Sequence, residues 1–507
     1  MNTHVAPPPL VIFGLDVGDP EWLERWASEG HLPTLASIMR RGVAARTTGP
    51  DLITEHSVWV SLISGISVGQ HGFYEYKRLK PGTYELETIT GRDLDVRPFW
   101  SHAPAKRAVA IDVPHCYPEP RTNGIHLAEW ASHHPYFSPS ASPEGLLEEI
   151  GRSFGGQIHI PEELNSKPQA DRRIHGRALE RIQKKGALCR RLLSRESFDV
   201  AVVVFGDSHL ASHQFWEYRP EHCGERKLDP RDELTHGMRD VFQRIDHEMG
   251  AIIEQLPADA NICVVSSTGL LDHYPTTGLI DAFCRELGYQ ASPTGSGRAS
   301  PMSVVRQLVP HKLRYALSRW LPEETQLRLM NEKFRSSTDW SRTTAFAIPS
   351  FFTSFLRINL AGREPCGVVE PGAEYEALLD RLETDLRQLT NPDTGEPVVE
   401  DVVRTGAVFG DASTAALPDL FVVWRPHQSY MERVAHPSGE LMAFPPEIFR
   451  GSDHSRSGFV ALAGPSIQVT SVGHVSLLDL APTFLALMGE STPRELIGKP
   501  LPILVRG

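Results

Sequence analysis

The stretch at residues 199–216 constrains the fold of this chain most, because a buried-strand pattern there leads directly into a group of polar side chains. Residues 200–205 are apolar and mostly β-branched, which predicts a strand buried on both faces of a sheet. Asp207, His209 and His213 follow almost at once. Because ligands bind at the carboxyl ends of strands in open α/β sheets, these side chains are predicted to line a site.

The spacing of His209 and His213 indicates what that site binds. Four residues apart, the two imidazoles share one face of a helix or helical turn. Together with the Asp207 carboxylate they suit a divalent metal such as zinc. Two surface histidines after a core strand are the alternative, and the spacing alone leaves both open.

Other apolar runs alternate with helical patterns along the chain. Strands are predicted at residues 10–15, 108–113, 200–205, 262–266, 420–424 and 459–462. Helices are predicted at residues 21–28, 32–41, 146–153, 173–194, 232–255 and 375–389. This alternation predicts an α/β fold with a mainly parallel central sheet and helices on both faces.

Two segments interrupt the pattern. Residues 70–100 are an excursion with Gly and Pro turns, and residues 290–345 are basic and helical without a strand pattern. We interpret 290–345 as a helical insertion or lid, and a peripheral packing element is an equally good interpretation. With no internal repeat and no low-complexity linker, residues 1–507 are expected to form one catalytic domain.

Composition narrows the class of protein. The chain has 507 residues, 40% of them hydrophobic and 22% charged, which is typical of a soluble globular protein. The net charge is -12, and no basic block indicates binding to nucleic acid or to an anionic membrane surface. An acidic protein can still bind an anionic substrate, because a bound metal supplies local positive charge. The six scattered cysteines and the absence of a signal-peptide pattern lead us to expect a cytoplasmic protein. Nothing in the sequence indicates an oligomeric state.

Several motifs occur in a fixed order. They are Asp16 after the first strand, Thr54-Glu55-His56-Ser57, the 199–216 stretch, Ser266-Ser267-Thr268-Gly269, and Asp453-His454 before Gly458. This set resembles the alkaline phosphatase superfamily, in particular its type I phosphodiesterase and nucleotide pyrophosphatase branch, over nearly the whole chain. The resemblance implies an alkaline phosphatase-like three-layer sandwich. It also implies metal-dependent hydrolysis of a small anionic phosphoric ester, a diester or pyrophosphate rather than a monoester.

The resemblance also implies roles for individual residues. Asp16 matches the first carboxylate ligand, and His213 and His454 match metal-binding histidines of the family. The family holds two divalent metals, commonly zinc, with manganese as another candidate, and a Thr or Ser hydroxyl attacks phosphorus.

The sequence departs from the family at both metals. His209 stands where the family has an Asp, and Asp207 could then be a ligand or support one from behind. Ser267 and Thr268 replace an Asp and a His that ligate the second metal. Asp272 and His273 follow five residues later and could replace these ligands, with an ordinary loop pair as the alternative. The chain is therefore expected to bind one metal or two.

The nucleophile position is shifted as well. It falls on Glu55, with Thr54 one residue earlier. Thr54 acts as the nucleophile if the alignment slips by one residue; otherwise Glu55 serves as a ligand, base or nucleophile. A helix N-cap with first-turn charge is the structural alternative.

Polar groups near another strand end are candidates for substrate contact. They are His115, Trp130 and His133, with loop packing as the alternative. Because function depends on the site more than on the fold, two other functions stay open. One is action on another ester, a sulfate or a phosphonate, or group transfer in biosynthesis, and the other is non-catalytic binding.

Overall fold

The protein divides into two compact units, each assembled from separate stretches of the chain. The computed structural model describes residues 6–119, 122–133, 136–162, 167–221, 228–273, 278–293, 321–350, 354–427, 431–442 and 451–504. The first unit comprises residues 1–73, 90–271 and 451–507, and the second comprises 74–89 and 272–450.

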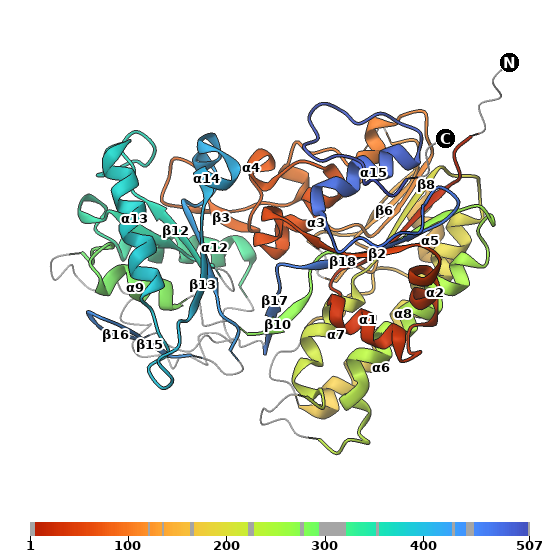
Figure 1. The fold of residues 1–507 in the computed structure, drawn as a ribbon, viewed down its shortest axis with the longest axis horizontal. Helices are drawn as coiled ribbons and strands as arrows, with labels where there is room; N and C mark the ends of the chain where they lie inside the picture. Colours follow the sequence, from red (N-terminus) through yellow and green to blue (C-terminus); the bar gives the residue numbers. More distant parts are fainter. Residues whose placement is uncertain are drawn as a thin grey trace. The chain divides into compact units, whose positions relative to one another are not determined.

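The first unit is built on a large sheet (Figure 1). In its described part, nine strands lie in the order β19-β2-β18-β9-β1-β8-β5-β6-β7. The bounds are β1 (Leu10–Leu15), β2 (Val43–Thr48), β5 (Ala108–Ile111), β6 (Gly124–Ala128), β7 (Ser140–Ser142), β8 (Val200–Phe205), β9 (Asn261–Ser266), β18 (Gly458–Ala463) and β19 (His474–Ser476). The run from β9 to β6 is parallel, whereas β18 and β7 pair antiparallel with their neighbours.

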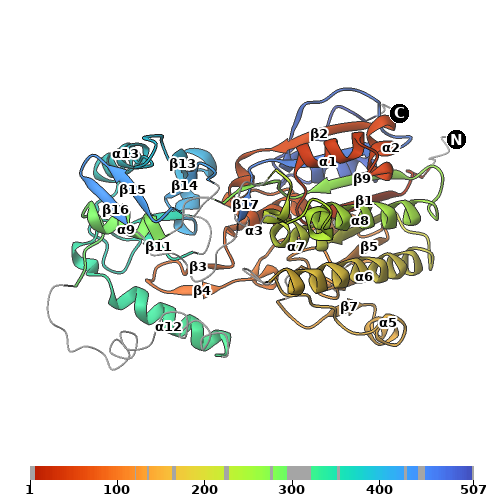
Figure 2. The same cartoon turned by 90° about the horizontal axis from the view of Figure 1, so that it is seen from below.

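Both faces of this sheet are covered. Along β1, Val11, Phe13 and Leu15 belong to one buried cluster and Leu10 and Ile12 to another, because successive side chains point to opposite faces. Helices therefore pack on each side, as expected for a parallel sheet. In Figure 2, α6 and α8 lie side by side on one face.

The described helices of the first unit include the five predicted at residues 21–28, 32–41, 146–153, 173–194 and 232–255, although the last two each begin five residues from the expected start. They are α1 (Pro20–Ser28), α2 (Pro33–Arg41), α3 (Glu55–Ser64), α4 (Val68–His71), α5 (Leu146–Phe154), α6 (Pro168–Leu193), α7 (Asp207–Gln214), α8 (Gly237–Ile253) and α15 (Leu480–Leu487). Asp19 caps α1 by accepting the N–H groups of Glu21 and Trp22. Among the described helices, none is long and apolar enough to cross a membrane.

The second unit contains a smaller antiparallel sheet in the order β11-β12-β14-β13. Its strands are β3 (Lys77–Leu79), β4 (Leu86–Thr88), β11 (Ala345–Ile348), β12 (Ser354–Ile358), β13 (Val399–Arg404), β14 (Leu420–Trp424), β15 (Arg433–His436) and β16 (Gly439–Met442). Its helices are α9 (Gly278–Glu286), α12 (Glu323–Ser336), α13 (Ala373–Arg387) and α14 (Thr405–Phe409). A short strand pair, β10 (Leu270–Asp272) and β17 (Ser452–His454), lies outside this sheet, and all of β17 and the first two residues of β10 belong to the first unit.

The predicted α/β class, with a mainly parallel sheet covered on both faces, is confirmed. One strand assignment needs correction, because residues 420–424 form β14 of the antiparallel sheet instead of a strand of the central one. In the expected insertion, residues 323–336 form α12, and residues 294–320 lie outside the described part of the chain. The single-domain organisation stays a prediction.

Candidate metal centre

Four side chains from distant parts of the sequence meet in the first unit. Glu55, His209, His213 and His454 each offer a ligand atom, and these atoms all lie within 4.8 Å of one another. Glu55 is the first residue of α3, both histidines at 209 and 213 lie on α7, and His454 ends β17. The centre therefore forms where α7 follows the carboxyl end of β8, as expected for an open α/β sheet.

The i,i+4 spacing on α7 places His209 and His213 on one side of the helix, as predicted. Their ring centroids are 4.8 Å apart, and His454 lies 5.0 Å from the first ring and 4.9 Å from the second. The three imidazoles thus surround a common region.

Each imidazole is held by an oxygen on its Nδ1 side. The pairs are His213 Nδ1 with Ser452 Oγ at 2.8 Å, His454 Nδ1 with Thr268 Oγ1 at 2.9 Å, and His209 Nδ1 with Asp16 Oδ2 at 3.5 Å. When Nδ1 carries the proton and faces such an oxygen, Nε2 keeps the lone pair that binds a metal.

The Nε2 atoms converge. Those of His213 and His454 are 3.1 Å apart, and Glu55 Oε2 contacts His454 Nε2. Tetrahedral ligands at zinc–nitrogen distances are separated by roughly 3.3 Å, so this spacing fits a shared ion. Nε2 of His209 is buried and finds no hydrogen-bond partner among the described residues. A buried nitrogen without a partner is costly, and a bound cation would satisfy it.

Burial also sets the charge of these groups. It lowers the pKa of His209 to about 4, and the nearby His133 acts in the same direction. His209 is therefore neutral near pH 7, which is the form that ligates a metal. Burial by itself would raise the pKa of Asp16, but its hydrogen bond and charge attraction with His209 hold that pKa below its usual value.

The structure places two predicted ligands next to other partners. Asp16 Oδ1 accepts the indole N–H of Trp59 at 2.6 Å, so its carboxylate lies behind His209 and outside the four-residue cluster. Asp207 is fully buried and pairs with Arg181 Nε at 2.7 Å. It is not a member of the cluster either.

The structure separates the two nucleophile candidates. Glu55 faces the histidines and also lies 3.2 Å from His56 Nε2. Thr54 is the N-cap of α3, and its buried hydroxyl lies 2.9 Å from that of Ser57. Thr54 and Glu55 are thus adjacent in sequence but have different partners.

The substrate-contact candidates have different environments. His133 stacks on His209, with centroids 3.9 Å apart, and pairs with Glu162 at 3.2 Å. His115 is half-buried beside Phe73, and desolvation lowers its pKa to about 3. The side chain of Trp130 is fully buried, and its indole N–H donates to the Gly155 carbonyl. It therefore packs inside the protein.

Three residues with roles at this site were missed from the sequence. Thr268 and Ser452 hold imidazoles, and Glu162 pairs with His133. Thr268 had a signal, because it stands where the family has a metal ligand. Asp272 and His273, the suggested substitutes, belong to the second unit.

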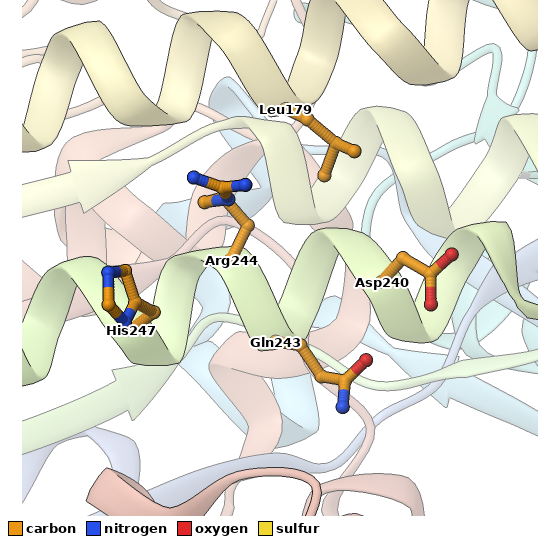
Figure 3. A pocket seen from close by; sticks show the side chains of 5 residues that line it. All are labelled: Leu179, Asp240, Gln243, Arg244 and His247. Carbon is orange, nitrogen blue, oxygen red and sulfur yellow. The ribbon is translucent and has the colours of Figure 1, made fainter.

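A surface depression of about 410 Å³ lies elsewhere, along α6 and α8 (Figure 3). Leu179, Asp240, Gln243, Arg244 and His247 line it. None of these five residues belongs to the metal centre.

Two solved structures are similar to this chain over nearly its whole length. Phosphonoacetate hydrolase from Sinorhizobium meliloti 1021, in complex with phosphonoformate, is 13% identical, with 96% of each chain covered and a TM-score of 0.53. Murine ectonucleotide pyrophosphatase/phosphodiesterase 5 is 11% identical, with 95% of each chain covered and a TM-score of 0.45. A search of curated protein sequences finds no match.

A family model covers most of the chain. The model described as type I phosphodiesterase / nucleotide pyrophosphatase matches residues 10–454, the span that contains Asp16, Glu55 and all three metal-centre histidines. The resemblance read from the ordered motifs is thereby confirmed, and the protein belongs to the type I phosphodiesterase / nucleotide pyrophosphatase family of the alkaline phosphatase superfamily.

Proposed function

We propose that this protein is a metal-dependent hydrolase of phosphoric esters that prefers a diester or a pyrophosphate to a monoester. The observation that carries the proposal is the convergence of Glu55, His209, His213 and His454 in a member of this family. Its substrate is a small anionic ester, whose charge a bound cation would balance.

The donor set favours zinc. Three imidazoles and one carboxylate are typical zinc ligands, and manganese is the other candidate. A divalent cation held there would supply a Lewis acid that offsets negative charge on the phosphoryl oxygens. Glu55, His209, His213 and His454 would hold this cation, while Asp16, Ser452 and Thr268 fix the ring orientations.

We assign the nucleophile to Thr54 and a ligand role to Glu55. The Glu55 carboxylate already contacts His454. A cation bound there would balance its negative charge and engage its lone pairs, which makes it a poor nucleophile. The Thr54 hydroxyl lies one residue away and hydrogen-bonds a second hydroxyl, that of Ser57, through which its proton can be oriented.

The first experiment measures metal content and substrate range. We expect purified protein loaded with zinc or manganese to cleave bis(p-nitrophenyl) phosphate faster than p-nitrophenyl phosphate. Phosphonoacetate is included because it tests the phosphonate alternative. Release of phosphate from it alone would replace our assignment, and a protein that binds no metal would refute hydrolysis by this centre.

The second experiment separates the two neighbouring residues. Thr54→Ala should keep its metal and lose activity by at least about 10²-fold, whereas Glu55→Gln should lose the ion that Glu55 binds and the activity with it. Exposed Thr384 and Glu376 supply matched controls, Thr384→Ala and Glu376→Gln, which should leave both unchanged. Full activity of Thr54→Ala would overturn the nucleophile assignment.

We propose a cytoplasmic location on the basis of the cysteines. The described ones are free thiols, four buried and Cys366 exposed, which is consistent with a reducing cytoplasm.

A further inference from the structure

A second group of metal-binding side chains lies beside the first. His133, Glu162 and His209 each offer a ligand atom, and these atoms lie within 4.8 Å of one another. His133 follows β6, Glu162 lies between α5 and α6, and His209 is on α7. His209 thus belongs to both groups.

The six side chains of the two groups can be divided into two equal sets of ligands. Assigning His209 to the second group leaves Glu55, His213 and His454 in the first, so each group contains two imidazoles and one carboxylate. Two histidines with one glutamate form a known three-ligand catalytic set, which leaves a fourth position open. We propose that His133, Glu162 and His209 bind a second divalent cation beside the one held by Glu55, His213 and His454.

The positions of the ring nitrogens support this second site. Nε2 of His209 is buried and has no hydrogen-bond partner among the described residues, while its Nδ1 faces Asp16. His133 Nε2 lies 3.2 Å from Glu162 Oε1, a spacing that fits two ligands of one ion. A cation is the ligand that two histidines and a carboxylate attract together.

The charges are also compatible with two ions. Glu55 and Glu162 bring one carboxylate to each set, and Asp16 adds a third negative charge beside His209. The remaining positive charge of two dications would attract an anionic ester. This deepens the proposed function and rests on it, because the second ion would face the same substrate.

The second site needs a small rearrangement to bind its ion. The rings of His133 and His209 are nearly parallel, with an interplanar angle of 13° and centroids 3.9 Å apart. A metal lies in the plane of each imidazole that binds it, so one ring must turn. His209 also contacts Asp16, His213 and His454, whereas His133 pairs with Glu162, so His133 is the ring expected to turn.

The second site also accounts for the family ligands that this chain lacks. Ser267 and Thr268 cannot replace the missing Asp and His as strong ligands. Ser267 instead donates to the Asp16 carbonyl and Thr268 holds His454. His133 and Glu162 offer a different way to hold a second ion.

Counting bound zinc tests the inference directly. Full-length protein is loaded with zinc at pH 7.5, dialysed against a weak chelator and analysed for metal per chain. We expect two ions in the native protein and one in Glu162→Gln and in His133→Ala. Glu55→Gln should lose the other ion and keep one. Exposed His474 supplies the control His474→Ala, which should keep two, and circular dichroism verifies that each variant is folded.

The outcomes separate this inference from the proposed function. One ion in the native protein, retained in Glu162→Gln and His133→Ala, overturns the second site and leaves the hydrolase proposal standing. A single ion lost in variants of either group also overturns it, because one ion would then be shared. No bound ion, together with no hydrolysis, would refute both.

Discussion

At the scale of single residues, the metal centre depends on oxygens that do not touch the ion. Ser452 and Thr268 are almost fully buried, and their hydroxyls fix His213 and His454 so that both Nε2 atoms face each other. Such outer partners typically change metal affinity by 10–100-fold, because they fix the tautomer and orientation of the ring.

Replacing Thr268 should therefore weaken metal binding. Thr268→Val keeps the shape but removes the hydroxyl next to His454 Nδ1. We expect zinc affinity to fall by about 10–100-fold, measured by competition with a chromophoric chelator. Thr268→Ser retains the hydroxyl and should bind zinc within about threefold of the native protein. Equal loss in both variants would mean that Thr268 acts through packing instead.

The sequence predicts some of these residues and not others for a physical reason. His209 and His213 could be found because their relation is local, one helical turn on one element. The contact between Thr268 and His454 joins residues 186 positions apart, and a hydroxyl has many possible partners. Glu162 carries no local pattern at all, so only the folded chain identifies its neighbour.

At the scale of elements, the turn from β8 into α7 determines how the two metal groups approach each other. Gly206 forms this turn, and a Cβ at this position would lie 2.5 Å from the backbone nitrogen of His133. The close approach lets the loop that carries His133 reach His209. Glycine is needed here because a side chain would clash with His133, and not because of the backbone conformation, since a φ of -70° is ordinary for any residue.

Gly206→Ala should displace that loop. We expect a loss of about 1–3 kcal/mol in the free energy of unfolding, measured with urea, because a backbone segment must move. Zinc bound per chain should fall from two to one. Gly176→Ala, in the exposed interior of α6 with no atom near the added Cβ, is the matched control. It should raise stability by about 0.5–1 kcal/mol. If Gly206→Ala changed neither the free energy of unfolding nor the zinc content, the loop that carries His133 would be able to move without cost.

Elements with strong apolar periodicity were predictable, and the partners of strands were not. Runs such as Leu10–Leu15 and Val200–Phe205 are buried throughout, and their continuous apolar sequence indicates a buried strand. The run at Leu420–Trp424 is equally buried but pairs with β12 and β13 in an antiparallel sheet. A local run reports burial and carries no information on which strand lies beside it. β17 is short and polar, so it lacked even that signal.

At the scale of the whole molecule, the residues of both metal groups belong to one unit. Glu55, His133, Glu162, His209, His213 and His454 come from all three stretches of the first unit. The second unit, made from residues 74–89 and 272–450, supplies none of these six. This division could not be predicted from the sequence, because neither unit is continuous and no linker composition marks the crossings.

Zinc should therefore stabilise the two units unequally. A ligand that binds only the folded state, at 100 times its dissociation constant, adds about 2.7 kcal/mol to the free energy of unfolding. That gain should appear where the ligands tie separate stretches together. In hydrogen exchange measured by mass spectrometry, peptides covering α3, α7 and β17 should exchange more slowly with zinc. Peptides covering β12 and β14 should be unchanged, and zinc with excess chelator should reproduce the metal-free pattern. Equal slowing in β12 and β14 would contradict the expectation, because it would mean that the units open together and that the free energy of metal binding is shared by the whole chain.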